Sequence, residues 1–278
     1  MHFIKYQGLG NDFIFVDGQT ETFSNLSSAA QVLCDRRFGV GADGLILMTP
    51  CKDSHHARMR IINADGSEAE MCGNASRCAP LFWRELGYLK TNELVLDTLA
   101  GPIITRVKDW SAGWVSVDMG VPRLTRAEIP MTGQADSQAI EIPLTAAGQS
   151  WRGTAVSMGN PHFVIFVPDI HGVSVEKVGP EIEKHLLFPK KTNVEFVQKI
   201  DSRTLRMRVW ERGAGITQAC GTGSCATAVA AVLTDRTEEQ VRILLDGGEL
   251  NIDWRGRQHI YMSGPARKVF EGEYVHDL

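Results

Sequence analysis

The chain has 278 residues, of which 43% are hydrophobic, and a formal net charge of −4 at pH 7. This composition is typical of a globular protein in water, and the absence of a basic block argues against a nucleic-acid partner. No stretch reaches the roughly 20 apolar residues of a membrane span, and the first residues lack the pattern of a signal peptide. We therefore expect a cytoplasmic protein with no membrane partner.

In the first half, short apolar runs separated by turns predict strands. These runs are residues 3–6, 13–17, 45–48, 58–63, 93–98, 103–108 and 114–118. Ser27 or Ser28 can cap a helix that runs to about Asp35. A second helix is predicted from about Asn74 to Leu86, because a glycine follows it directly.

The second half repeats this order of elements. Strands are predicted at residues 152–157, 163–167, 194–198 and 205–210, with a helix at about 176–187. A last helix, from Thr222 to about Leu233, is rich in Gly, Ala, Ser and Thr. Such small residues let a backbone approach its neighbours closely, so we expect a buried central helix.

One cysteine-headed turn occurs twice, as CGNAS at residues 72–76 and as CGTGS at residues 220–224. A second echo, GNDF at 10–13 and GNPHF at 159–163, has the same spacing to within one residue. The repeats predict an α+β fold of two pseudo-symmetric domains, each a mixed, mostly antiparallel sheet wrapped around a central helix. We place the domains at residues 1–121, with 266–278 returning to them, and at 122–265.

The chemistry is predicted to lie at Cys72 and Cys220, one at the start of each central helix. A thiol there meets unpaired N–H groups and the positive end of the helix dipole, which favour thiolate. Gly73 and Gly221 follow, so the backbone can approach a bound carboxylate closely. Two facing thiols suit inversion of a carbon next to a carboxylate, one removing a proton and the other delivering one. This chemistry requires no cofactor and no metal.

Simpler interpretations exist for several of these residues. A cysteine near a helix start is often only a small buried apolar side chain, which is how we interpret Cys34, Cys51, Cys78 and Cys225. The six cysteines are expected to be reduced, and their spacing does not match a zinc site. Asn11 and Asn160 can cap turns or line the site, and His162 is open to both readings as a supporting residue.

With these residues in hand, the chain resembles the diaminopimelate epimerases, which interconvert LL- and meso-diaminopimelate without a cofactor. The resemblance runs nearly from end to end. It includes Lys5 and residues 8–13, 41–44, 63–74, 157–162, 192–195, 210–213 and 219–223.

The resemblance implies roles for individual residues. Cys72 and Cys220 would be the acid and base, and a homodimer would be the working form. Backbone N–H groups after each cysteine would hold the reacting carboxylate, at Gly73, Asn74, Gly221 and Thr222. The distal end of the substrate would be bound by Asn63, Asn160, Asn193, Glu211 and Arg212. Asn11 is carried over as a site residue by its motif.

Two departures from the family pattern leave the substrate open. Ala75 and Ser76 stand where the family usually has Gly-Ala, and Pro80 lies inside the predicted helix, where it removes an N–H and can kink the helix. A related two-cysteine racemase acting on proline or histidine is one alternative, against which Asn74 and the Glu211–Arg212 pair argue. A non-catalytic binding protein for diaminopimelate is another, against which the two cysteines argue.

Overall fold

The computed structural model describes residues 1–51 and 56–275. The chain forms two compact units, one of Met1–Asp118 with Ser263–Leu278 and one of Met119–Met262. The sequence-based division was residues 1–121 with 266–278, and residues 122–265. Residues 276–278 of that division lie outside the described part of the chain.

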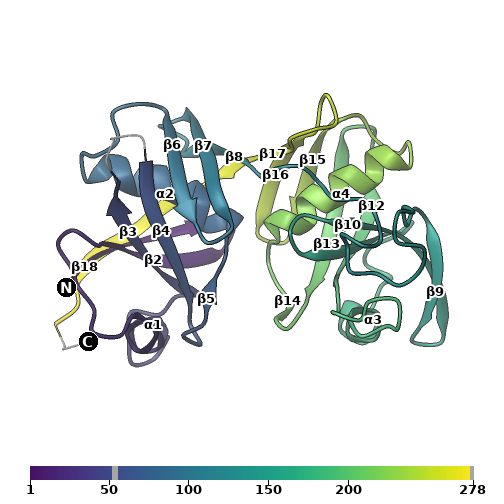
Figure 1. Cartoon of the computed structure of the whole chain (residues 1–278), viewed down its shortest axis with the longest axis horizontal. Helices are drawn as coiled ribbons and strands as arrows, with labels where there is room; N and C mark the ends of the chain where they lie inside the picture. The colour runs from purple at the N-terminus through teal and green to yellow at the C-terminus, as the bar shows by residue number, and fades with distance from the viewer. Residues whose placement is uncertain (52–55, 276–278) are drawn as a thin grey trace. The chain divides into compact units, whose positions relative to one another are not determined.

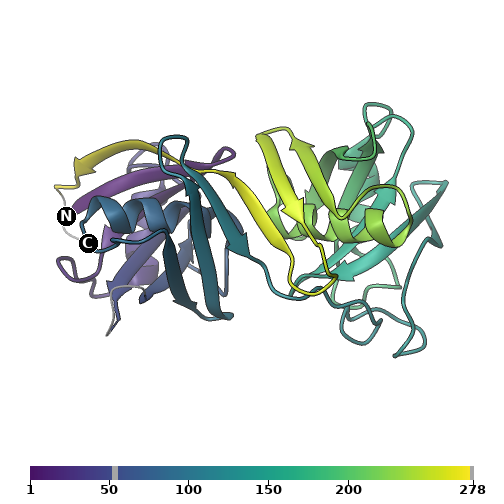
Figure 2. The same cartoon turned by 90° about the horizontal axis from the view of Figure 1, so that it is seen from above.

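Unit 1 is a mixed sheet with two helices. Its strands are β1 (His2–Gly8), β2 (Asn11–Asp17), β3 (Gly44–Pro50), β4 (His56–Asn63), β5 (Glu68–Ala69), β6 (Glu93–Thr98), β7 (Gly101–Asp109), β8 (Trp114–Asp118) and β18 (Arg267–Glu273). Its helices are α1 (Leu26–Cys34) and α2 (Gly73–Glu85). The pairs β2–β3 and β4–β6 are parallel, whereas β1–β2, β3–β4 and β6–β7 are antiparallel. The late strand β18, yellow, pairs antiparallel with the purple β1 (Figure 2).

Unit 2 repeats this arrangement. Its strands are β9 (Ile142–Ala146), β10 (Gln149–Ser157), β11 (Pro161–Phe166), β12 (Asn193–Lys199), β13 (Thr204–Glu211), β14 (Gly215–Ile216), β15 (Gln240–Leu245) and β16 (Gly248–Asp253), and β17 (Tyr261–Pro265) begins at its end. Its helices are α3 (Val175–Glu183) and α4 (Gly221–Leu233). Here β11–β12 and β13–β15 are the parallel pairs, and β10–β11, β12–β13 and β15–β16 are antiparallel. The same order and pairing in both units confirm the predicted α+β fold class.

Helix α2 is the centre of unit 1 (Figure 1). Its inner face, including Ala79, Phe82 and Trp83, packs with Phe15 and Tyr6 of the sheet in one buried apolar cluster. Pro80 lies inside the helix, which nevertheless continues from Gly73 to Glu85. The helix then ends where Gly87 adopts a φ of 80°, a conformation that glycine reaches without steric cost. Ala75 is buried inside the helix, and helical backbone suits alanine.

Helix α4 is the centre of unit 2, and it packs against β10, β11, β12, β15 and β16 (Figure 1). Nearly all of its side chains are buried, including those of Ser224 and Thr227. Because its residues are small, the helix axis can lie close to the sheet. The expectation of a buried central helix is therefore confirmed.

Three local predictions are corrected by the structure. Helix α1 begins at Leu26, two or three residues earlier than a cap at Ser27 or Ser28 predicts, and its cap is Asn25, whose side chain accepts a hydrogen bond from the Ser28 N–H. Helix α3 ends at Glu183 rather than near Leu187, because turns replace it, with the His185 N–H donating to the Ile182 carbonyl and the Phe188 N–H to the His185 carbonyl. Strands β5, β9 and β14 to β17 were not predicted; β5 and β14 have two residues each, too few for a periodic signal.

Candidate active site

Both predicted cysteines are the N-cap residues of central helices. Cys72 precedes α2 with φ −140° and ψ 113°, and Cys220 precedes α4 with φ −126° and ψ 112°. The extended backbone of an N-cap points the side chain back over the first helical turn, whose N–H groups have no partner within the helix. Gly73 and Gly221 are the first helical residues in each case. Each unit thus presents one thiol beside one potential anion site.

The thiol of Cys72 faces a hydrogen-bond acceptor. Its Sγ lies 3.9 Å from Oδ1 of Asn11, and the same oxygen accepts from Nδ2 of Asn74 at 3.2 Å. Nδ2 of Asn11 donates to Asp43 at 2.6 Å, and Nη2 of the fully buried Arg77 donates to Oδ1 of Asn74 at 2.9 Å. A guanidinium at one end and a carboxylate at the other fix the direction of every bond in this chain.

A network of ion pairs holds Asp43, the acceptor for the Asn11 side chain, in place. Arg36 binds Asp12 at 2.7 Å and Asp43 at 2.8 Å, and Nζ of the buried Lys5 binds Asp12 at 2.8 Å. Burial pushes the pKa of Asp12 upward, but hydrogen bonds from Arg36 and Lys5 outweigh burial, so the pKa is lowered. The network keeps Asp12 ionised and Asp43 in place beside Asn11.

The thiol of Cys220 lies instead beside a backbone N–H donor and a hydroxyl group. It is 4% exposed, and its Sγ accepts from the Gly223 N–H at 3.4 Å and lies 3.6 Å from the Thr222 hydroxyl. Burial raises the pKa of Cys220 well above its ordinary value, and the nearby Glu211 and Glu195 carboxylates raise it further. The two hydrogen bonds lower the pKa by less than burial raises it.

A chain of polar side chains continues behind Cys220. Nδ2 of Asn160 donates to the Thr222 hydroxyl at 3.3 Å, and Oδ1 of Asn160 lies 3.1 Å from Nε2 of His162. Nδ1 of His162 lies 2.6 Å from Oε1 of Glu195. His162 and Glu195 are both 0% exposed, and burial raises the pKa of Glu195, although His162 counteracts this. These contacts link the predicted residues Asn160, His162 and Thr222 to Cys220.

The residues expected to bind the distal end of a substrate form a second group. Oδ1 of Asn193 accepts from the Arg212 N–H at 2.9 Å, and its Nδ2 donates to the Pro161 carbonyl at 2.8 Å, so Asn193 positions Arg212. The Arg212 side chain is exposed and donates to a backbone carbonyl at 3.0 Å. Glu211 accepts from the Thr217 hydroxyl.

Asn63, also predicted to bind the distal end, belongs to unit 1. It is the exposed last residue of β4, and its Nδ2 donates to the Ser67 hydroxyl at 2.9 Å. It corresponds to Glu211, the last residue of β13 in unit 2. Both residues therefore end the equivalent strand of their unit.

Sequence reasoning did not assign roles to Asp43 or Glu195. Both stood in recognised motifs, and Glu195 carried one further signal, since it is a lone acid in the apolar run of β12. A Cβ built on Gly223 would lie 2.7 Å from Oε1 of Glu195 and 3.2 Å from Sγ of Cys220. The turn therefore needs glycine at position 223 to bring the carboxyl and the thiol close together.

The remaining cysteines have no comparable setting. Cys34, Cys78 and Cys225 are buried, and Cys51 is partly buried. Burial raises the pKa of both Cys34 and Cys78 to about 12, so neither is a reactive thiolate near neutral pH.

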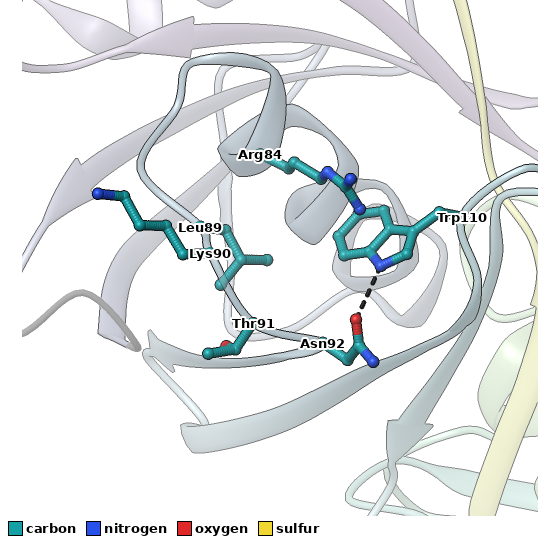
Figure 3. Close-up of a pocket in the computed structure, with 6 residues that line it drawn as sticks. All are labelled: Arg84, Leu89, Lys90, Thr91, Asn92 and Trp110. Atoms are coloured by element: carbon teal, nitrogen blue, oxygen red, sulfur yellow. Dashed lines mark hydrogen bonds between the residues drawn. The ribbon is translucent and has the colours of Figure 1, made fainter.

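A surface pocket of unit 1 has a volume of about 460 Å³ and contains none of the predicted site residues. Its lining includes Arg84, which stacks on the Trp110 ring, and Asn92, which accepts from Trp110 (Figure 3). Within residues 1–51 and 56–275, no group of three or more His, Cys, Asp or Glu side chains could hold a metal ion. No helix of these residues is long and apolar enough to cross a membrane.

Solved structures share this fold at low sequence identity. A predicted epimerase from Pseudomonas aeruginosa matches with a TM-score of 0.70 and 15% identity over 99% of both chains. A hydroxyproline epimerase from Agrobacterium vitis matches with a TM-score of 0.64 and 16% identity, over 98% of this chain and 90% of that one. At such low identity these matches establish the fold alone.

Sequence comparison identifies the family. The sequence model described as diaminopimelate epimerase matches residues 3–125 and 154–269. The diaminopimelate epimerase of Moorella thermoacetica is 50% identical over 100% of both chains, and that of Pelotomaculum thermopropionicum is 51% identical over 99% of both. The chain therefore belongs to the diaminopimelate epimerase family, as its motifs predict.

Proposed function

We propose that this protein interconverts LL- and meso-diaminopimelate by removing the α-proton with one cysteine and returning a proton to the opposite face with the other. The observation that carries this proposal is the repeated N-cap position of Cys72 and Cys220 in a chain half identical to diaminopimelate epimerases over its full length. Inversion requires one acid and one base on opposite faces of the carbon, and two thiols provide both.

The helix starts supply the electrostatic part of this mechanism. As the α-carbon loses its proton, negative charge builds on the carboxylate. N–H groups at Gly73, Asn74, Gly221 and Thr222, together with the positive ends of α2 and α4, would stabilise that charge. The proton leaves as S–H on one cysteine while the other cysteine gives up its own, so one thiol and one thiolate are present before and after turnover.

The distal end of the substrate would be held by Glu211 and Arg212, with Asn63, Asn160 and Asn193 completing the polar contacts. A distal ammonium needs an anionic partner, and a distal carboxylate suits the planar guanidinium of arginine. Arg212 is exposed, so its charge is accessible to a ligand. We also infer a place in the synthesis of lysine and of peptidoglycan precursors, which follows from this substrate.

We further propose a cytoplasmic homodimer. The six cysteines, all within the described residues, form no disulfide, which fits a reducing compartment. Val269 and Phe270 of β18 are 51% and 43% exposed, and an exposed apolar strand favours cover by a second copy. Sedimentation of the purified chain tests the dimer; a monomer at micromolar concentration would contradict it.

The test of the activity is proton NMR of candidate amino acids incubated with the enzyme in heavy water. Diaminopimelate should lose its α-proton signal, whereas proline, hydroxyproline and histidine should keep theirs. Exchange of proline or histidine at the rate seen for diaminopimelate would instead favour a racemase of different specificity.

Arg212→Met tests how the substrate is recognised. Loss of one partner of a desolvated charge pair commonly costs about 2 to 5 kcal/mol, so kcat/KM for diaminopimelate should fall by a factor of tens to thousands. Arg208→Met is the matched control, because Arg208 lies on β13, the strand that Arg212 directly follows, and pairs with Asp246 at 3.6 Å. A threefold change or less in Arg212→Met would mean that this arginine does not bind substrate.

A further inference from the structure

The buried Glu195 is a carboxyl group that the proposed mechanism does not use. It is 0% exposed, and in the part of the chain that the structure describes its Oε2 has no hydrogen-bond partner. Burying a carboxyl with an unsatisfied oxygen is costly. Because burial of this carboxyl group costs free energy, its position beside the Cys220 turn indicates a functional role.

Unit 1 shows that the fold itself does not require an ionisable pair at this place. In the parallel pair β2–β3, Phe13 lies opposite Gly44, and in β11–β12 His162 lies opposite Asn193. Two residues further along, Ile46 of unit 1 therefore corresponds to Glu195 of unit 2. Phe13 and Ile46 are 3% and 0% exposed, so the same positions accept an apolar pair in unit 1.

The contacts of His162 define a direction of hydrogen bonding toward Cys220. Oδ1 of Asn160 can only accept, so the Nε2 of His162 that faces it at 3.1 Å carries a proton. Asn160 then donates through Nδ2 to Thr222, which leaves the hydroxyl hydrogen of Thr222 free to point at the Cys220 sulfur. In this arrangement the chain ends in a donor, which stabilises a thiolate.

The opposite direction follows when the Glu195–His162 pair holds one proton fewer. With Glu195 ionised and Nδ1 of His162 donating to it, Nε2 becomes an acceptor. The Asn160 amide then turns over and gives its N–H to His162, so its oxygen accepts from the Thr222 hydroxyl. The Cys220 thiol can then donate to Thr222. The two arrangements differ by one proton on the pair and by the rotation of one amide.

We propose that Glu195 is a positioning residue that sets, through His162, Asn160 and Thr222, whether the chain donates to Cys220 or accepts from it. What this switch would be used for rests on the proposed function, since a two-base enzyme needs Cys220 as a thiol and as a thiolate in turn. The geometry that carries it lies within unit 2. In unit 1 the direction of the hydrogen-bond chain cannot reverse in this way, because its two ends are the charged side chains of Arg77 and Asp43.

The experiment measures the pH at which alkylation of Cys220 reaches half its maximal rate, by mass-spectrometric mapping of iodoacetamide-treated enzyme without substrate. The charged groups that act on Cys220 are Glu211 and Glu195, and His162 lies behind Asn160, so two variants of Glu195 separate charge from hydrogen bonding. Glu195→Gln removes the charge but still donates to Nδ1 of His162. Glu195→Ile removes both and introduces the residue that unit 1 carries at this place.

If Glu195 acts through the chain, the half-reaction pH of Glu195→Ile should exceed that of Glu195→Gln by about one unit, a tenfold difference in thiolate fraction. If Glu195 acts only as a nearby negative charge, the two variants shift equally, which would overturn the proposal. Thr222→Val cuts the chain beside Cys220 and should abolish the difference between the two variants.

Thr222→Val also keeps the proposal testable if the Glu195→Ile protein does not fold. Alone, it should raise the half-reaction pH of Cys220 by about one unit, because the donor next to the sulfur is lost. An unchanged value would overturn the proposal without the isoleucine variant. Because alkylation requires no turnover, a failure of the epimerase activity would leave this result interpretable.

Discussion

The two cysteine turns have the same backbone and opposite surroundings. Cys72 faces the acceptor oxygen of Asn11, whereas Cys220 accepts from the Gly223 N–H and lies beside the Thr222 hydroxyl, which can donate or accept. The polar chain behind Cys72 ends on the charged Arg77 and Asp43, and the chain behind Cys220 ends on the titratable His162 and Glu195. The repeat thus diverged both within the turn, where Asn74 and Ala75 correspond to Thr222 and Gly223, and in the residues behind it.

This difference has a chemical consequence. A fixed acceptor favours the protonated form of the thiol that faces it, while donors favour the thiolate. Two identical surroundings would give two thiols of equal acidity, with neither preferred as acid or as base. The surroundings of the two thiols are therefore unequal, and at Cys220 burial raises the pKa by more than the two hydrogen bonds lower it.

Removal of either thiol is the largest expected effect. Cys72→Ala and Cys220→Ala should each lower kcat/KM for epimerisation by about 10²- to 10⁴-fold or more, because one face of the carbon loses its acid or base. Cys34→Ala and Cys51→Ala are the matched controls, since neither lies at a helix start, and they should stay near the parent rate. Steady-state kinetics of folded proteins provide the measurement, and a Cys220→Ala enzyme at the parent rate would refute the assignment.

A smaller effect is expected from weakening the hydrogen-bond chain behind Cys72 in unit 1. In Asp43→Asn the carboxylate that receives the Asn11 N–H and the Arg36 guanidinium is replaced by an amide, so Asn11 can turn its N–H toward Cys72. We expect kcat/KM to fall about tenfold, equivalent to about 1.4 kcal/mol. The control is Asp253→Asn, which breaks an ion pair with Arg255 on the surface of unit 2. Equal kinetics in the two variants would show that the direction of the Asn11 amide is unimportant.

The smallest expected effects are opposite pH dependences of stability in the two networks. The pKa of Asp12 is lowered in the folded protein, so its contribution is present above its ordinary value of 3.8 and is lost as pH falls through the lowered value. The pKa of Glu195 is raised, so stability falls as pH rises from its ordinary value of 4.5 through the raised value.

Urea unfolding over a pH series checks both signs. Relative to the parent, Asp12→Asn should flatten the loss of unfolding free energy below pH 3.8. Glu195→Gln should flatten the decline that begins above pH 4.5. Slopes of the same sign for both residues would contradict the difference drawn between the two networks.

The sequence predicted the elements that repeat, and it predicted the two N-cap cysteines, because helix starts and apolar periodicity are local properties. The short strands β5 and β14 were not predicted, since two residues are too few to show an alternation of apolar and polar side chains. A role for Glu195 was not predicted from the sequence either. A lone acid in the apolar strand β12 is visible in sequence, but its partner His162 is 33 residues away and meets it only through a parallel strand pair.

The central claim is that two different thiols act on the two faces of one carbon, and the fate of the α-hydrogen tests it most directly. LL-diaminopimelate should be incubated briefly with the enzyme in heavy water and the products followed by proton NMR and mass spectrometry. The account predicts that the first meso product carries solvent deuterium at the inverted carbon, while the remaining LL substrate keeps its proton. Early meso product that retains the substrate's own proton would show a single base acting on both faces, and would contradict the account.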